Sequence, residues 1–210
     1  MKIFLVRHGE TEWNKEEVFR GKVDVPLNDK GLDQAKKTGS YLVKFSPEKV
    51  YSSPLQRARQ TASIIAEINS IPLYLLDELT DMSFGIWEGL SLNEVKTAYP
   101  LEFEIWKRCP EKWRMDGAEN LKKVRRRVSK AVEKILKENG HGKNVVLVTH
   151  RVICKVISLI FLGLPNSGFW RIKFDPASVS IFEYDGSSFV TTLLNNTSHL
   201  DHLGVNYSDF

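Results

Sequence analysis

Short apolar runs alternate along the chain with longer segments in which apolar side chains recur every three or four positions. The short runs predict buried strands over Ile3–Val6, Lys49–Tyr51, Leu73–Leu76 and Asn144–Thr149. The longer segments have the period of amphipathic helices. Strands that alternate with helices form a mostly parallel sheet covered on both faces, so we expect an α/β fold of the three-layer αβα sandwich type.

The helices are predicted from their apolar spacing and from the residues at their ends. One is expected over Lys30–Phe45 with Asn28 as its N-cap, and the next within Ser52–Ile68. The segment Leu92–Trp113 is helical in pieces because prolines interrupt it. Asn120–Lys137 carries its apolar side chains on one face, which is typical of a helix that packs on a sheet.

The last patterned segments, Ser178–Tyr184 and Phe189–Leu194, predict a β-hairpin that turns at Asp185-Gly186. This hairpin gives the sheet a short antiparallel edge, which is a surface that a homodimer could use. Because no linker or internal repeat interrupts the pattern, residues 1–195 are expected to form one domain. The polar residues 196–210 are expected to be a loosely held C-terminal tail.

Charge and composition exclude several classes of protein. The formal net charge is +4, and the densest basic stretch, Lys122–Lys130, is expected to be the solvated face of a helix. We therefore expect no nucleic-acid partner, because such binding requires a concentrated basic stripe. The N-terminus does not resemble a signal peptide, and the longest apolar stretch, Val152–Leu164, is too short to span a bilayer. A cytoplasmic protein without membrane contact is expected, which also fits its two widely spaced cysteines.

Two of the predicted strands end in histidine. His8 follows the first strand directly after Arg7, and His150 follows the strand at Asn144–Thr149. Ligands of open α/β sheets bind outside the carboxyl ends of the strands. If these two strands are neighbours, both imidazoles face one crevice, where a catalytic role is more plausible than for either histidine alone.

Several motifs follow one another in an order that resembles the histidine phosphatase superfamily, in its phosphoglycerate-mutase-like branch. The first is Leu5–Asn14, which contains the Arg-His-Gly signature. The motifs that follow it are Gly21 with Pro26–Asn28 and Gly31, then Ser52–Ala62, Phe84–Gly89, Gly117–Glu119 and Val148–His150. The resemblance reaches to about Leu194.

The resemblance implies a role for each matching residue. His8 matches the nucleophile that becomes phosphohistidine, and the backbone near Gly21 matches the loop at the substrate entrance. Asp81 lies where the family usually places its general acid. The residues that match the pocket for the transferring phosphoryl group are Arg7, Asn14, Arg57 and His150. The resemblance implies a small phosphorylated substrate, no cofactor and no metal.

The chemistry of phosphoryl transfer agrees with these roles. The transferring group spreads negative charge over three oxygens, so catalysis depends on positioning and on electrostatic stabilisation. Arginine suits this task because its fork binds oxygens in pairs and stays charged. An imidazole attacks only when it is neutral, and nearby arginines disfavour its protonated form. A carboxylic acid supplies the proton that lets an alcohol leave.

The sequence departs from the family at three places. The acid is usually Glu, whereas this chain has Asp81, with Asp77 and Glu78 as nearby competitors. Arg151 replaces the glycine that commonly follows the second histidine, and Arg20 stands where relatives often carry a small or amide side chain. We consider Arg20 and Arg151 as contacts to a second negative group on the substrate. The alternatives are that Arg20 is a solvated loop arginine and that Arg151 points away and caps the helix.

Two other functions remain open. A phosphoglycerate mutase would carry an insertion with paired arginines to grip a second anionic group, and only Leu90–Asp116 fills that place here, so a phosphatase is favoured. A phospholigand-binding regulatory protein with little turnover is the second alternative, to which only the change at Asp81 points. The natural substrate stays open among phosphoserine, α-ribazole phosphate, phosphoglycerates and sugar phosphates.

Overall fold

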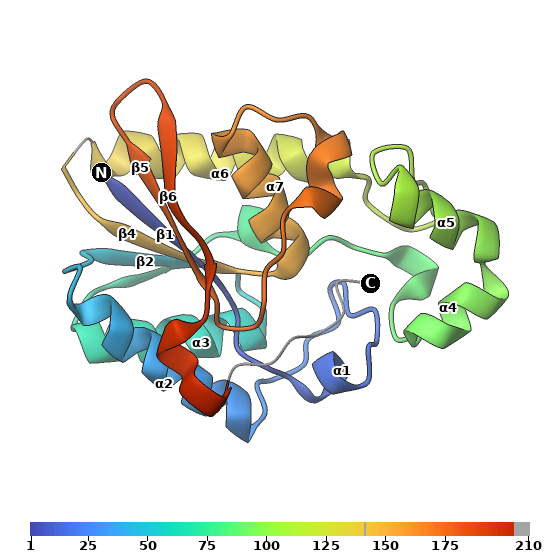
Figure 1. The fold of residues 1–210 in the computed structure, drawn as a ribbon, viewed down its shortest axis with the longest axis horizontal. Helices are drawn as coiled ribbons and strands as arrows, with labels where there is room; N and C mark the ends of the chain where they lie inside the picture. The colour runs from blue at the N-terminus through green and yellow to red at the C-terminus, as the bar shows by residue number, and fades with distance from the viewer. Residues whose placement is uncertain (141, 204–210) are drawn as a thin grey trace.

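A six-stranded mixed sheet lies at the centre of the computed structural model, which describes residues 1–140 and 142–203 (Figure 1). Its strand order is β3-β2-β4-β1-β5-β6. The first four of these strands are parallel, and β5 and β6 run antiparallel at one side. The strands are β1 (Lys2–Arg7), β2 (Lys49–Ser52), β3 (Leu73–Leu75), β4 (Val145–Thr149), β5 (Val179–Tyr184) and β6 (Phe189–Asn196).

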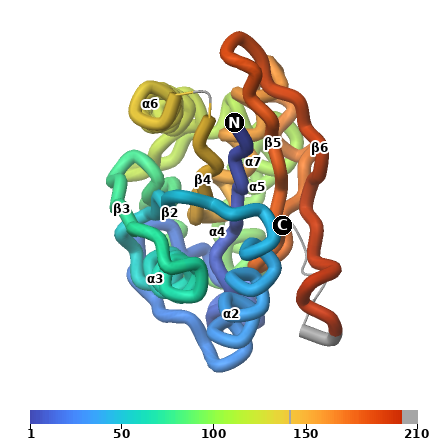
Figure 2. Tube along the Cα trace, turned by 90° about the vertical axis from the view of Figure 1, so that its left-hand side faces the viewer, coloured from blue at the N-terminus to red at the C-terminus, as the bar shows by residue number. Residues whose placement is uncertain are grey.

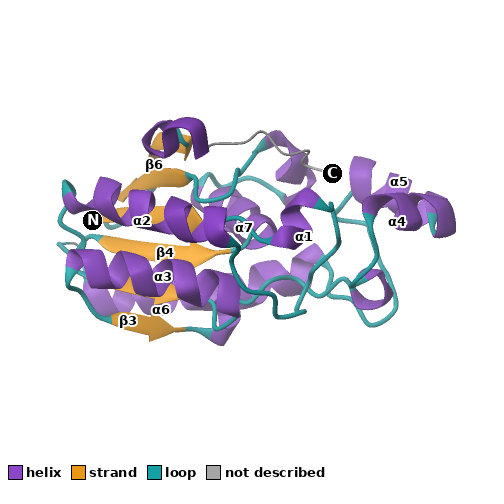
Figure 3. Cartoon of the chain, turned by 90° about the horizontal axis from the view of Figure 1, so that it is seen from below, coloured by secondary structure: helices purple, strands orange, loops and turns teal. Residues whose placement is uncertain are grey.

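Helices cover both faces of the sheet, which confirms the predicted three-layer sandwich. In Figure 1, α6 (Leu121–Asn139) and α7 (Arg151–Phe161) lie above the sheet, and α2 (Asp29–Val43) and α3 (Gln56–Asn69) lie below it. Figures 2 and 3 show the same layers from two other directions. Alternate residues of β1 and β4 enter the two apolar cores, because successive side chains of a strand point to opposite faces.

The shorter elements gather mostly beyond the carboxyl ends of the parallel strands (Figure 1). They are α1 (Glu12–Lys15), α4 (Leu92–Ala98), α5 (Pro100–Arg108) and the 3₁₀ helices η1 (Asp77–Leu79), η2 (Gly85–Trp87), η3 (Asn166–Arg171) and η4 (Ser198–Leu203). An aromatic cluster holds this region together: Trp113 lies with its ring centroid 4.9 Å from that of Trp87 and 5.2 Å from that of Trp106. Pro100 begins α5, where its missing N–H costs no hydrogen bond.

Helix boundaries largely follow the predictions. The side chain of Asn28 accepts a hydrogen bond from the Gly31 amide and caps α2, although this helix ends at Val43 rather than at Phe45. The hairpin also forms as predicted, but the free edge that it gives the sheet is β6, because β5 pairs with β1 on one side and with β6 on the other. No helix in the described part of the chain is long and apolar enough to cross a membrane.

The prediction of a loosely held tail is wrong for the part of it that the structure describes. Leu200 is fully buried, and the imidazole of His199 stacks on the ring of Tyr41 at 4.7 Å. Nζ of Lys37 lies 2.7 Å from Oδ2 of Asp201. The segment thus packs on α2. Leu200 is a single apolar residue among polar ones, so no periodic signal in the sequence predicts this packing. The remainder of the predicted tail, 204–210, lies outside the described residues.

Candidate active site

The two histidines meet because β1 and β4 are neighbouring parallel strands. Arg7 pairs with Thr149 at the carboxyl end of the two strands, so His8 and His150 leave the sheet side by side. Their ring centroids are 5.2 Å apart. The sequence predicted that both imidazoles face one crevice if these strands are neighbours. The strands are neighbours and the imidazoles lie together, but neither of them lines the pocket described below.

Backbone contacts hold the turn after β1 in place. The amide of His8 donates to the Thr149 carbonyl at 2.9 Å, and the amide of Gly9 donates to Oγ1 of Thr61 at 3.1 Å. The start of α2 packs so closely on this turn that a Cβ on Gly31 would lie 2.1 Å from the carbonyl oxygen of Glu10. Only glycine allows such an approach, which gives a physical reason for Gly31 in the motif.

His8 is buried in a form suited to nucleophilic attack. Its Nδ1 lies 2.7 Å from the Gly9 carbonyl oxygen, which can only accept a hydrogen bond, so Nδ1 carries the proton and Nε2 keeps its lone pair. Burial lowers the pKa of His8 well below 6.5, and the charges of Arg57, Arg7 and Arg20 lower it further. The imidazole is therefore neutral at physiological pH.

His150 is also neutral, and its tautomer is fixed in the opposite sense. Arg57 donates from Nε to Nδ1 of His150 over 3.2 Å, so the proton of the ring lies on Nε2, which is 2.8 Å from Oγ of Ser53. Burial lowers the pKa of His150 well below 6.5, followed by the charges of Arg57 and the imidazole of His8. Ser53 belongs to a motif noted in the sequence, but its contact with His150 was not predicted.

Arg57 links several parts of the site from the first turn of α3. Besides His150, its guanidinium donates to the carbonyl oxygens of Gly21 and Val23, each at 2.9 Å, and Nη2 lies 3.3 Å from Oδ2 of Asp81. Burial lowers the pKa of Arg57, and the charge of Asp81 partly offsets this effect. The entrance loop and the candidate acid are thus both tied to one buried cation.

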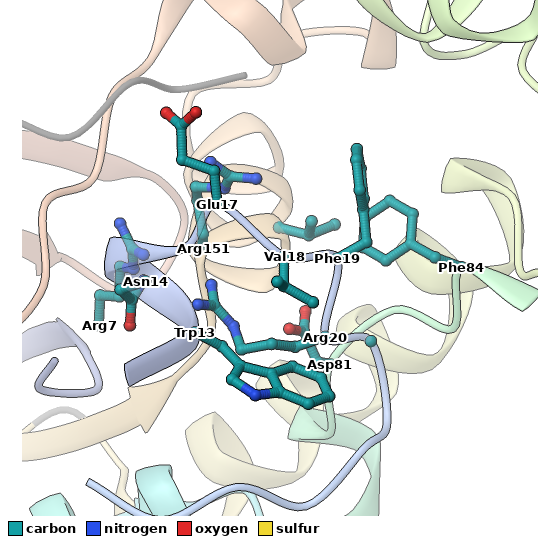
Figure 4. Close-up of a pocket in the computed structure, with 12 residues that line it drawn as sticks. Arg7, Trp13, Asn14, Glu17, Val18, Phe19, Arg20, Asp81, Phe84 and Arg151 are labelled. Atoms are coloured by element: carbon teal, nitrogen blue, oxygen red, sulfur yellow. The ribbon is translucent and has the colours of Figure 1, made fainter. Parts of the chain in front are cut away.

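A pocket opens beside this cluster (Figure 4). His8, Arg57 and His150 lie behind its wall and are at most 1 % exposed. The pocket brings together most of the predicted site residues, and these are Arg7, Asn14, Arg20, Gly21, Asp81 and Arg151. The residues that line it without having been predicted there are Trp13, Glu17, Val18, Phe19, Phe84 and Val152.

Arg20 is an unusual cation in this pocket. Its Nε is buried without a hydrogen-bond partner among the described residues. Burial lowers the pKa of Arg20 well below its ordinary value, and so do the charges of Arg57, Arg7 and Arg151. Arg20 is partly buried and has three cations and only one carboxylate, Asp81, among the charges that act on it, so an anion would stabilise it and the arrangement is suited to bind one.

Asn14 and Asp81 place one amide and one carboxylate at the same pocket. Oδ1 of Asn14 accepts from the amide and hydroxyl of Thr11, each at 3.0 Å, which points the oxygen away and leaves the amide nitrogen as a donor. Oδ1 of Asp81 accepts from the Met82 amide at 2.9 Å, and Oδ2 lies 3.8 Å from Nδ1 of His150. The competitors Asp77 and Glu78 do not line the pocket.

Arg127 departs from the prediction made for the basic stretch on α6. The basic stretch Lys122–Lys130 was expected to be a solvated helix face, but Arg127 turns inward and only 20 % of its side chain is exposed. It donates hydrogen bonds to the backbone of the segment that contains Asp81. In contrast, Arg126, which directly precedes it on α6, is exposed as predicted.

No group of three or more His, Cys, Asp and Glu side chains among the described residues is arranged to hold a metal ion. Cys154 is buried in the core and Cys109 is a free thiol. The polar groups at the pocket are instead dominated by guanidinium cations, a donor set that fits an oxyanion.

Comparison with known proteins agrees with the motifs and the fold. The model of the histidine phosphatase superfamily (branch 1) matches residues 3–197. The chain belongs to the histidine phosphatase superfamily. Among its relatives in this superfamily is phosphoserine phosphatase 1 of Hydrogenobacter thermophilus, which is 34% identical over 205 residues, with 98% of this chain and 97% of the relative covered.

Other members of the histidine phosphatase superfamily are similarly close. The probable phosphoglycerate mutase GpmB of Salmonella choleraesuis is 30% identical over 210 residues, with 96% of this chain and 95% of the relative covered. The solved structure of Bacillus stearothermophilus YhfR superposes with a TM-score of 0.89 at 31% identity, covering 95% of this chain and 98% of that chain. The predicted family and fold are thereby confirmed.

Proposed function

We propose that this chain hydrolyses phosphomonoesters through a phosphohistidine on His8, with Asp81 as the general acid and base. The observation that carries the proposal is the state of His8. Its Nδ1 proton is held by the Gly9 carbonyl, its pKa is depressed by burial and by three arginines, and Nε2 keeps a lone pair beside the same arginines. The arginines that keep His8 neutral thus lie where they could also bind a phosphoryl group.

The reaction proceeds in two steps. Nε2 of His8 attacks phosphorus while the bond to the ester oxygen breaks, and Asp81 protonates that oxygen so that an alcohol leaves. A water molecule then attacks the phosphohistidine, its proton passes to Asp81, and the P–N bond breaks to release inorganic phosphate and neutral His8. Arg7 and Arg57 stabilise the charge of the phosphoryl oxygens in both steps.

The substrate that we propose is a phosphorylated amino acid, with phosphoserine as the first candidate. Arg20 and Arg151 supply cations for a carboxylate beyond the phosphoryl group, and Glu17 supplies a carboxylate for an ammonium group at the same pocket (Figure 4). The 34% identical relative carries the name phosphoserine phosphatase. Both observations support a zwitterionic substrate, whereas a sugar phosphate would leave these charges without partners.

Phosphoglycerate mutase is the second candidate because of the 30% identical relative of that name. The segment 90–116 argues against it, since none of its residues lines the pocket. Its two arginines make other contacts: Arg108 pairs with Glu104 at 2.8 Å, and Arg114 donates to the carbonyl oxygens of Glu111 and Trp113. At this pocket, the segment 90–116 thus offers no cation to hold the second phosphoryl group of a bisphosphorylated intermediate.

The proposal is tested by turnover in the presence of EDTA, with phosphoserine, p-nitrophenyl phosphate and 3-phosphoglycerate as substrates. We expect release of inorganic phosphate that is lost in His8→Ala, together with an acid-labile phosphoenzyme in the wild-type protein. Interconversion of phosphoglycerate isomers faster than phosphate release would favour the mutase. Tight phosphate binding without turnover of any substrate would favour the regulatory protein.

A further inference from the structure

One side chain, that of Arg127, makes three hydrogen bonds to the backbone of the segment that carries Asp81. We define the acid loop as Glu78–Phe84. Nη1 of Arg127 donates to the carbonyl oxygens of Glu78 and Thr80, each at 2.6 Å, and Nη2 donates to that of Asp81 at 3.1 Å. The only regular structure in the acid loop is the end of the short helix η1, and few hydrogen bonds join its backbone to other backbone groups.

The remaining donors of Arg127 go to Glu119. Nε lies 3.0 Å from Oε1, and Nη2 lies 3.0 Å from Oε2, in the bidentate geometry that arginine forms with a carboxylate. Oε2 of Glu119 also accepts from the amide of Ser83 at 3.1 Å. The pair therefore binds the acid loop on both sides of Asp81, at the carbonyl of that residue and at the amide two positions later.

Arg127 has no hydrogen-bond donor left for a substrate. A guanidinium has five N–H groups, and each of them has an acceptor in the loop or on Glu119. Burial alone would raise the pKa of Glu119, but the hydrogen bonds and charge of Arg127 bring it below its ordinary value, so the pair stays ionised at neutral pH. Arg127 differs in this respect from Arg20, whose Nε has no partner among the described residues.

We propose that the Arg127–Glu119 pair positions Asp81 for proton transfer to the leaving oxygen. The inference rests on the proposed function, because it concerns the acid of that reaction. General acid catalysis requires the carboxyl group within hydrogen-bond reach of the leaving oxygen, and a displacement of about 1 Å can cost about 100-fold in rate. Aspartate has a shorter side chain than the glutamate usual in this family, so the placement of its backbone matters more.

The test compares Arg127→Met with Arg126→Met, an exposed control at the adjacent position of α6. Both variants are assayed on phosphomonoesters whose leaving groups range from p-nitrophenol to an alkyl alcohol. A good leaving group departs without a proton, whereas an alkoxide needs one. We compare kcat/KM, which reports the steps up to release of the alcohol and leaves out the later attack of water on the phosphohistidine. For Arg127→Met it should fall about 100-fold on the alkyl ester and less than about 5-fold on p-nitrophenyl phosphate, with Arg126→Met like wild type.

Coupling to the acid separates positioning from a general loss of structure. If Arg127 acts through Asp81, the double variant Arg127→Met/Asp81→Asn should lose no more activity on the alkyl ester than Asp81→Asn alone. Equal losses on every leaving group, or losses of the two substitutions that multiply, would overturn the inference. Arg127→Lys keeps the positive charge but cannot donate to three carbonyls and Glu119 together, so only partial rescue is expected.

The outcomes also distinguish this inference from the proposed function. A wild-type protein without phosphatase activity, or an Asp81→Asn variant without leaving-group dependence, would contradict the proposed function itself. If Arg127→Met does not fold by circular dichroism, Glu119→Gln tests the same pair, because it weakens the contacts to Arg127 and Ser83 without emptying the space. The same leaving-group dependence is expected of it, and its absence would count against the pair.

Discussion

Asp81 and the entrance loop accept hydrogen bonds from the same nitrogen: Nη2 of Arg57 lies 3.3 Å from Oδ2 of Asp81 and 2.9 Å from the Gly21 carbonyl oxygen. The residue proposed to bind phosphoryl oxygens is thus in contact with the residue proposed to protonate the leaving group. In the proposed reaction, a phosphoryl group bound by Arg57 would therefore lie close to the carboxyl group of Asp81.

Asp81→Glu should retain activity on alkyl phosphomonoesters within about 10-fold of wild type, whereas Asp81→Asn should lose about 100-fold or more. The reason is that glutamate restores the acid that the family usually carries, and asparagine has no acidic proton. Steady-state kinetics on phosphoserine checks this. Glu78→Gln is the matched control, and a loss in that variant larger than in Asp81→Asn would assign the acid to Glu78.

The free energy of unfolding should decrease as the pH falls below about 6.5. His8 and His150 are held neutral by burial and by arginines, while an unfolded chain protonates its histidines near pH 6.5 and so binds more protons. At pH 5.5, each histidine that stays neutral in the folded state costs about 1.4 kcal/mol relative to neutral pH.

Urea unfolding at pH 7.5 and pH 5.5 measures this effect. The difference between the two pH values should be smaller in His150→Gln than in wild type, since that variant lacks one of the two groups. Equal differences in both proteins would show that the pKa of His150 is not depressed in the folded state.

Phosphate should stabilise the protein, because it relieves the repulsion among the cations at the pocket. A ligand at 100 times its Kd adds about 2.7 kcal/mol to the free energy of unfolding. Thermal melts in phosphate and in sodium chloride of equal ionic strength should therefore differ. In Arg20→Gln the phosphate effect should shrink, while the melting temperature without phosphate should not fall, since Arg20 has like-charged neighbours. An undiminished phosphate effect would exclude Arg20 as an anion ligand.

Arg151→Gln should raise KM for phosphoserine about 10-fold, which corresponds to the lower range for a hydrogen bond to a charged group. Phenyl phosphate has no second anionic group, so its kcat/KM should change by less than about 3-fold. Arg59→Gln, an exposed position on α3, serves as the control. Equal effects on both substrates would mean that Arg151 contacts the phosphoryl group or acts through the fold.

Leu200→Ala should reduce the free energy of unfolding by about 2–5 kcal/mol, as is typical for a buried leucine. Activity at low temperature should be nearly unchanged, because Leu200 does not line the pocket. Denaturant unfolding gives the measurement. A change below about 0.5 kcal/mol would restore the view that this segment is loosely held.

Much of the fold and of the site could be predicted because both depend on local patterns. The strands are short apolar runs, and a histidine after such a run lies at the carboxyl end of the sheet wherever the strand pairs. Which strands are neighbours was left open by the sequence, and the adjacency of β1 and β4 came from the structure. The motifs predicted that Arg57 and Asp81 belong to the site, but they did not predict that the two side chains are in contact.

The inward direction of Arg127 could not be predicted from the same patterns. Along α6, basic side chains surround an apolar stripe, and Arg127 lies at its border between buried Val124 and Val128. Only the position of Glu119 and of the acid loop, which belong to other segments, decides that this arginine is not solvated. Leu200 was overlooked for a similar reason, since one apolar residue among polar ones gives no periodic signal.

The pairing of β1 with β4 has a consequence for the order in which the molecule acquires activity. His8 leaves the ribosome among the first residues, but its partner strand is synthesised only after more than half of the chain has emerged. Until then no second imidazole and no adjacent strand can complete the site. A nascent or truncated chain that ends before β4 would contain His8, the proposed nucleophile, but should have no phosphatase activity. The proposed activity would therefore appear only once synthesis has passed β4.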